Sequence, residues 1–232
     1  GYPLMRQARE MIANGELGKL RIVQAEYAQD WLTEDSQNKQ ADWRTDPKRS
    51  GAGAIGDIGT HAFNLLSFVS GLDTEALSAD LHSFVDGRQV DDNAHILLRL
   101  EGGARGMIWA SQVAVGRENS LSLRIFGENG GLEWCQENPN QMRFSRFGAA
   151  PQILTRGGAG LGEGADRWTR IPPGHPEGYL EGFANVYSDA ADLITGSNVG
   201  RLLPGIDAAL DGMWFISACQ ASSRNDAVWV RK

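Results

Sequence analysis

An aspartate and a histidine, Asp57 and His61, stand four residues apart in the segment SGAGAIGDIGTH. On a helix, side chains at positions i and i+4 are neighbours, with Cβ atoms about 5–6 Å apart, so both can face one small molecule. A neutral imidazole can accept a proton from a hydroxyl group, and an adjacent carboxylate can orient the ring or bind that hydroxyl. The spacing therefore indicates an acid/base pair. The alternative is a helix-capping aspartate beside a histidine without chemistry.

The same segment contains a G-x-G-x-x-G pattern at Gly51, Gly53 and Gly56. In a dinucleotide-binding fold this pattern follows a buried strand, which delivers the pyrophosphate to a helix N-terminus. Here the preceding residues are ADWRTDPKRS, which are polar and include Pro47, so they cannot form a buried strand. We therefore expect these glycines to let the backbone approach another group closely, and not to bind a cofactor.

Five further residues are candidates for contacting a substrate. Trp43 and Arg44 lie in a long polar segment before the glycines, where an arginine could reach a substrate hydroxyl or a cofactor phosphate. Thr60 and Asn64 flank His61 along the predicted helix, and His175 precedes a later helix. An exposed loop arginine and a polar surface asparagine are the alternatives at two of these positions.

A metal site is not predicted, because two ligands without a further nearby His, Cys or Glu fall short of a zinc set. A metal-dependent sugar isomerase or hydrolase is accordingly the least supported enzyme class. The two cysteines, Cys135 and Cys219, lie in a predicted strand and a predicted helix, and we expect both to be reduced core residues.

The remaining pattern predicts the elements that position these residues. Alternating apolar residues indicate a strand over 19–31 and several strands between 75 and 152, divided by glycine turns. Apolar residues at helical spacing indicate the helices, which we place at residues 4–14, 58–70, 177–194 and 204–223. Strands grouped between helices predict an α+β fold, with a large, mostly antiparallel open sheet and helices packed on one face. The polar stretch 32–53 is expected to be a functional loop.

Composition excludes several partners. The 232 residues carry 22 basic and 29 acidic side chains, and no basic run is longer than Lys48-Arg49, so nucleic acid is not an expected partner. No apolar run approaches the roughly 20 residues needed to cross a bilayer, so no membrane association is expected. The chain does not open with a secretory leader, and we expect a cytoplasmic protein.

Several segments together resemble one family. They are YPLMRQAREMIANGELGKLRIVQAEY, DWRTDPKRSGAGAIGDIGTHAFNLLSFVSG, GGARGMIWAS, IFGENGGLEW and HPEGYLEGFANVYSDAADLI. This sequence resembles the C-terminal domain of the Gfo/Idh/MocA family of NAD(P)-dependent sugar and polyol dehydrogenases. The resemblance implies a fold like the C-terminal domain of glyceraldehyde-3-phosphate dehydrogenase. It also implies one substrate-binding and oligomerisation domain over residues 1–232, without the family's N-terminal Rossmann domain and its E-K-P lysine.

The same resemblance implies roles for the pair. His61 would be the acid/base that takes the proton of the hydroxyl being oxidised, and Asp57 would position that hydroxyl and the missing lysine. NAD or NADP would be bound mainly by the missing domain, so this chain alone would be inactive. A homodimer or homotetramer through the sheet face is expected, and the substrate would be a sugar, an inositol or a related polyol. A non-catalytic ligand-binding or assembly module is the alternative.

Overall fold

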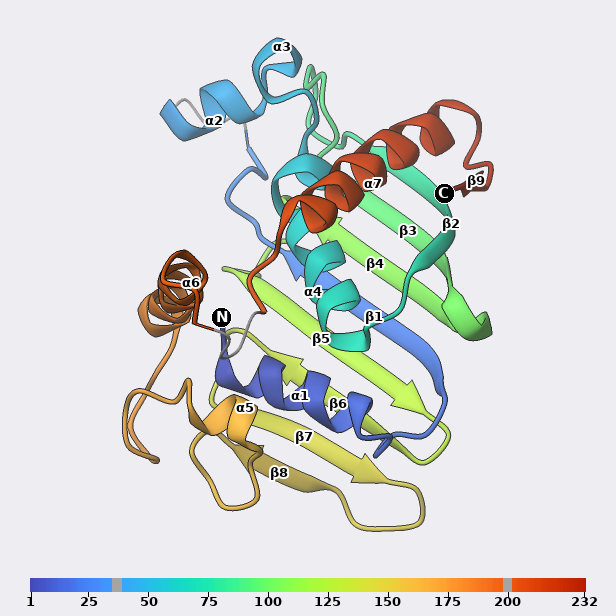
Figure 1. Ribbon diagram of the computed structural model, residues 1–232. Helices are drawn as coiled ribbons and strands as arrows, with labels where there is room; N and C mark the ends of the chain where they lie inside the picture. The colour runs from blue at the N-terminus through green and yellow to red at the C-terminus, as the bar shows by residue number, and fades with distance from the viewer. Residues whose placement is uncertain (35–38, 198–201) are drawn as a thin grey trace.

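The computed structural model describes residues 1–34, 39–197 and 202–232, and within these ranges the strands form one nine-stranded sheet (Figure 1). The order across the sheet is β8-β7-β6-β5-β1-β4-β3-β2-β9. The strands are β1 (Leu20–Ala28), β2 (Thr74–His82), β3 (Asn93–Leu100), β4 (Arg105–Ser111), β5 (Ser120–Gly127), β6 (Gly130–Cys135), β7 (Gln141–Arg146), β8 (Gln152–Thr155) and β9 (Val230–Arg231).

The first strand is inserted into the middle of this sheet. It pairs antiparallel with β5 and parallel with β4, and the other described strand pairs are all antiparallel. Ala28 is opposite both Ser111 and Ser120, so the ends of β1 and β4 and the start of β5 meet at one edge. That edge is where the sheet can present side chains from three strands to one site.

Three helices lie across one face of the sheet: α1 (Pro3–Ala13), α4 (Thr60–Ser70) and α7 (Ile206–Arg224) (Figure 1). A proline at the first helical position begins α1, and Gly71, in the left-handed conformation, ends α4. The inward residues of the central strands, such as Val23, Ala25 and Ile108, are fully buried beneath these helices. The predicted fold, a mostly antiparallel open sheet with helices on one face, is confirmed.

Five shorter helical elements and α6 are the remaining helices of the described residues. They are α2 (Lys39–Arg44), α3 (Pro47–Ser50), η1 (Ile55–Gly59), η2 (Glu101–Gly103), α5 (Glu163–Asp166) and α6 (Tyr179–Ile194). In Figure 1, α6 stands at the edge of the sheet beside the N-terminus, and α2 and α3 lie above η1. The expectation of a loop over 32–53 was therefore wrong for its second half, because Asp46 caps a short helix that begins at Pro47.

Candidate active site

The helix that carries the acid/base pair begins earlier than its apolar pattern predicts, at the π-helical turn η1. Asp57 lies in this turn and His61 in the first turn of α4, which continues directly from it. Single π-helical turns in longer helices often occur at functional sites, because they change the direction in which side chains project. Asp57 and His61 are not hydrogen-bonded to each other in the described part of the chain, so each can meet a ligand separately.

One glycine of the pattern before this helix, Gly53, lets the main chain of Asp91 approach closely. The Asp91 carboxylate accepts hydrogen bonds from the amides of Gly53 (2.9 Å) and Ile55 (2.7 Å), and a Cβ at Gly53 would overlap the main-chain oxygen of Asp91. Burial raises the pKa of Asp91, and these amide hydrogen bonds partly offset the effect. Because the protein's own carboxylate caps the helix start, these residues do not fit a dinucleotide pyrophosphate. Asp57, by contrast, is not the cap.

The carboxylate of Asp57 is held by two donors from distant parts of the chain. Arg44 donates from Nε (2.9 Å) and Gln112 donates from Nε2 (2.8 Å), and both bonds end on the same oxygen, Oδ2. Among the described residues, no donor reaches Oδ1. This arrangement fixes the carboxylate and leaves one oxygen available to accept a hydrogen bond from a ligand.

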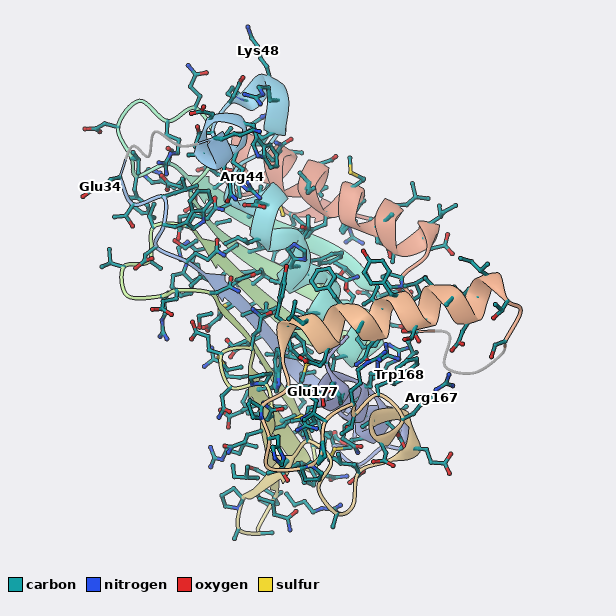
Figure 2. All side chains as sticks on the ribbon, turned by 90° about the vertical axis from the view of Figure 1, so that its left-hand side faces the viewer. Glu34, Arg44, Lys48, Arg167, Trp168 and Glu177 are labelled. Carbon is teal, nitrogen blue, oxygen red and sulfur yellow. The ribbon has the colours of Figure 1, made fainter. Side chains whose placement is uncertain are left out.

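Aromatic rings hold Arg44 in place. Its guanidinium carbon lies 4.4 Å from the ring centroid of Trp43 and 5.8 Å from that of Trp31. Figure 2 shows Arg44, the last residue of α2, beside η1. Stacking on aromatic faces orients a planar guanidinium. Trp43 therefore orients Arg44, and Arg44 in turn holds the Asp57 carboxylate.

His61 is exposed and borders two cavities. The larger one, about 680 Å³, lies between α4 and α7 and is also lined by Thr60 and Asn64. The smaller one, about 360 Å³, lies between β1, β5 and α6. His175 is exposed in the loop before α6 and lines neither cavity, although Tyr179 at the start of α6 lines the smaller one. The structure thus gathers four of the predicted positions, Asp57, Thr60, His61 and Asn64, on one helix.

Three residues that sequence reasoning did not select complete the site: Tyr27, Gln112 and Asn119. All three follow the inward alternation of their strands to the edge where β1, β4 and β5 meet. Gln112 is only 2% exposed, and the Tyr27 ring lies 6.1 Å from that of His61. The signal in the sequence that could have found them is a polar residue at an inward-facing position, at the end of an apolar strand or just beyond it.

The hydroxyl of Tyr27 donates to Asn119 Oδ1 at 2.8 Å. Burial raises the pKa of Tyr27, and the nearby Asp57 carboxylate raises it further, although hydrogen bonds with the amides of Gln136 and Asn119 partly oppose this. Tyr27 therefore remains protonated under physiological conditions, and its proton is already engaged. Of the two rings, His61 is therefore the one left to exchange a proton with a ligand.

A sequence profile described as the GFO/IDH/MocA C-terminal domain matches residues 5–133. The chain belongs to the Gfo/Idh/MocA family. Within that family, the uncharacterized oxidoreductase YfiI of Bacillus subtilis is 31% identical over 99% of this chain and 62% of its own length. The expected resemblance to this family's C-terminal domain is confirmed.

Two solved structures are similar over the whole of this Gfo/Idh/MocA domain. An oxidoreductase from Sinorhizobium meliloti is 51% identical, with a TM-score of 0.91, over 62% of that chain. An inositol dehydrogenase homologue from Azotobacter vinelandii, complexed with NADH and myo-inositol, is 35% identical, with a TM-score of 0.89, also over 62%. The present chain therefore spans less than two thirds of the length of the relatives that it matches.

Two further observations concern the described residues of the domain. No group of three or more His, Cys, Asp or Glu side chains within residues 1–34, 39–197 and 202–232 is arranged to hold a metal ion. In the same ranges, no helix combines the length and the apolar character that a bilayer span requires.

Proposed function

We propose that this domain binds the substrate and carries the proton-transfer group of an NAD(P)-dependent dehydrogenase that oxidises a CH–OH group of a sugar, an inositol or a related polyol. The observation that supports it most is the pair on one helix. Asp57 is fixed through Oδ2 and keeps Oδ1 for a ligand, and His61, one turn away, borders two cavities. The A. vinelandii homologue, which binds NADH and myo-inositol, adds support at 35% identity.

The chemistry assigned to this domain is proton transfer. Oxidation of a secondary alcohol removes the hydroxyl proton and a hydride from the carbon, and a C=O bond forms. His61 accepts the proton on a ring nitrogen, and Asp57 Oδ1 accepts a hydrogen bond from a neighbouring hydroxyl of the polyol, which places the reacting hydroxyl beside His61. A nicotinamide, when bound, supplies the hydride acceptor. In the reverse direction, the protonated imidazole of His61 returns the proton to the carbonyl oxygen.

Cofactor binding is not assigned to any residue of this chain. The glycine segment is closed by Asp91, and its residues do not fit a pyrophosphate. We propose that NAD or NADP is held mainly by a part of the full-length protein outside this chain, and that residues 1–232 alone are inactive. On this view residues 1–232 are one substrate-binding and oligomerisation domain.

The remaining candidate residues have different proposed roles. Arg44 and Trp43 support Asp57, so their proposed effect on the substrate is indirect. Thr60 and Asn64 are proposed to contact a substrate group that enters the larger cavity beside His61. His175 stays a prediction, because it lies outside both cavities.

The open face of the sheet is proposed to form a homodimer or homotetramer. Leu97 and Ile22, on this face, are 53% and 44% exposed. Glu26 and Arg124, on the same face, form an ion pair. An interface between subunits has an apolar core and a polar rim, and this face offers side chains of both kinds. Sedimentation of the full-length protein tests this, and a monomer at working concentration would contradict it. The cytoplasmic location also stays a prediction.

The test of the function uses the full-length enzyme. NAD⁺ and NADP⁺ are each combined with a panel of inositols, aldoses and anhydrosugars, and reduction of the nicotinamide is followed by absorbance. We expect reduction with at least one member of the panel. If the protein binds a panel member by calorimetry but reduces neither cofactor, the non-catalytic ligand-binding module becomes the better description.

A further inference from the structure

Asn119, which stands just before β5, lines the smaller of the two cavities beside His61, next to the hydroxyl end of Tyr27. Tyr27 and Leu121 form the sheet side of this cavity, and Tyr179 and Phe183 of α6 form the opposite wall. Three of these four side chains are aromatic, and aromatic walls pack against the C–H groups of a ring. A ring placed here with its reacting carbon at His61 has another edge toward Asn119.

Hydrogen bonds determine which way the Asn119 amide is turned. Its Oδ1 accepts from the Tyr27 hydroxyl (2.8 Å) and from Gln29 Nε2 (2.7 Å). Two donors on one atom identify that atom as the oxygen, so the other end of the amide is the NH₂ group. Within residues 1–34, 39–197 and 202–232, no acceptor is bonded to that NH₂ group.

Further hydrogen bonds hold the donor in place before any ligand arrives. Trp31 Nε1 donates to Gln29 Oε1 at 2.9 Å, so Gln29 is itself oriented. The main-chain amide of Asn119 donates to the Glu137 carboxylate at 3.1 Å. An amide held at both its backbone and its oxygen loses little freedom when a ligand binds.

The wall opposite Asn119 is also anchored. Asp189 of α6 forms a buried ion pair with Arg6 of α1 at 2.5 Å, and Asn185 donates to the main-chain oxygen of Gly1 at 2.9 Å. Glu177, beside the first turn of α6 (Figure 2), pairs with the buried Arg156 at 2.9 Å. The width of the cavity is therefore fixed by contacts between α6 and the rest of the domain.

We propose that Asn119 is a specificity-determining residue, whose side-chain NH₂ group donates a hydrogen bond to a substrate oxygen remote from the carbon that His61 serves. This inference rests on the proposed function. This NH₂ group can donate to a hydroxyl, an ether or a carbonyl oxygen, and it discriminates against an analogue that lacks this oxygen. A site built to hydrogen-bond one substrate group rejects the analogue without it far better than an apolar pocket does.

The experiment compares Asn119→Ala with the wild type in the full-length enzyme, on the best substrate of the panel and on each of its monodeoxy derivatives. We expect the variant to raise KM for the parent substrate about 10-fold, with kcat changed less than about 3-fold. For one monodeoxy derivative, wild type and variant should have the same KM, because the lost group and the lost donor are partners. Asn138→Ala, at an exposed turn, is the matched control.

A second variant separates hydrogen-bond donation by the Asn119 NH₂ group from the support that its oxygen gives to Tyr27 and Gln29. Asn119→Asp keeps an oxygen that accepts from Tyr27 and Gln29 but has no N–H. A substrate with fluorine in place of the identified hydroxyl can accept a hydrogen bond but not donate one. We expect the wild type to oxidise this fluoro analogue and Asn119→Asp to reject it by at least about 10-fold in kcat/KM.

The outcomes distinguish the two proposals. If the wild type oxidises no member of the panel, the proposed function fails. If the wild type is active but Asn119→Ala raises KM equally for the parent and for every monodeoxy derivative, Asn119 only supports the fold of the cavity and the inference is wrong. Melting temperatures within about 3 °C of wild type confirm that each variant is folded, since a change of 1 kcal/mol shifts a domain of this size by roughly 2–4 °C.

Discussion

The side chain of Gln112 donates a hydrogen bond of 2.8 Å to Asp57 Oδ2, although 55 positions separate the two residues in the chain. The bond joins the end of β4 to the π-helical turn η1, and Gln112 is almost completely buried there. A buried amide that supports a carboxylate fixes which of its oxygens remains available. The geometry of the proposed acid/base pair therefore depends on the sheet as well as on the helix.

Gln112→Glu tests that dependence. The change places a second carboxylate against Asp57 Oδ2, and two adjacent carboxylates tend to share one proton. The shared proton persists to a higher pH than for a lone carboxylate, so the acidic limb of the kcat/KM profile should move to higher pH. At about pH 7 we expect a loss of roughly 10-fold or more, measured by initial rates across pH.

A matched variant identifies the cause of that loss. Gln152→Glu introduces the same charge at an exposed position of β8, the edge strand of the sheet, without contact to Asp57 or to either cavity beside His61, so the acidic limb should keep its wild-type position. If both variants shift the limb equally, or if neither does, the hydrogen bond from Gln112 does not control Asp57.

His61→Ala removes the proposed proton acceptor. General acid–base groups typically contribute about 10²–10⁴-fold, so we expect turnover to fall by at least 10-fold while the affinity for the nicotinamide cofactor remains nearly unchanged. Steady-state kinetics and cofactor titration measure the two quantities. His82→Ala, at the exposed end of β2, serves as the control and should keep wild-type turnover. Unchanged turnover in His61→Ala would remove His61 from the mechanism.

Arg44→Lys is not expected to be conservative. The arginine combines a hydrogen bond from Nε to Asp57 with stacking on Trp43, and a lysine ammonium cannot reproduce the planar stack. Because the guanidinium is partly exposed, the effect should be moderate, about 3–10-fold in kcat/KM. Arg49→Lys, on the exposed side of α3, is the comparison and should be neutral.

Tyr27→Phe tests whether the phenol beside His61 titrates during catalysis. Burial and the Asp57 carboxylate raise the pKa of Tyr27 above its ordinary value of about 10, so the phenol stays protonated at every lower pH. We therefore expect the basic limb of the kcat profile below about pH 10 to be the same in the variant and in the wild type. Loss of that limb in Tyr27→Phe would show that the phenol is the titrating group.

Part of this site could be predicted because it is local. The spacing of Asp57 and His61 needs only a helix to bring them together, and the apolar pattern after Ile58 predicts that helix. The polar residues before Gly51 argued against the buried strand that a cofactor loop requires, and the structure has the short helix α3 there. The start of the helix was missed because the cap comes from Asp91, a residue distant in sequence whose carboxylate replaces a local capping side chain.

The rest of the site depends on contacts between distant strands. Nothing in the residues 20–28 indicates that β1 enters the sheet between β4 and β5, yet this insertion brings Tyr27, Gln112 and Asn119 to one edge. Strand order is decided by packing of the whole sheet and not by local propensity. Inward polar residues at strand ends were the available clue, and they gain meaning only when the order is known.

The last prediction concerns the glycine pattern itself. Gly53→Ala places a methyl group on the main-chain oxygen of Asp91, the residue whose carboxylate caps the start of the helix that carries Asp57 and His61. Overpacking against backbone typically costs about 1–3 kcal/mol, so the free energy of unfolding should fall by that amount, with a loss of activity because η1 is displaced. Gly212→Ala is the matched control, because a Cβ there meets no atom within 4 Å. In the interior of α7 that alanine should stabilise the domain by up to about 1 kcal/mol. Chemical denaturation of both variants measures the difference. If Gly53→Ala and the wild type are equally stable, the start of this helix can accommodate a methyl group at this position. The glycine segment would then again be a candidate site for a ligand.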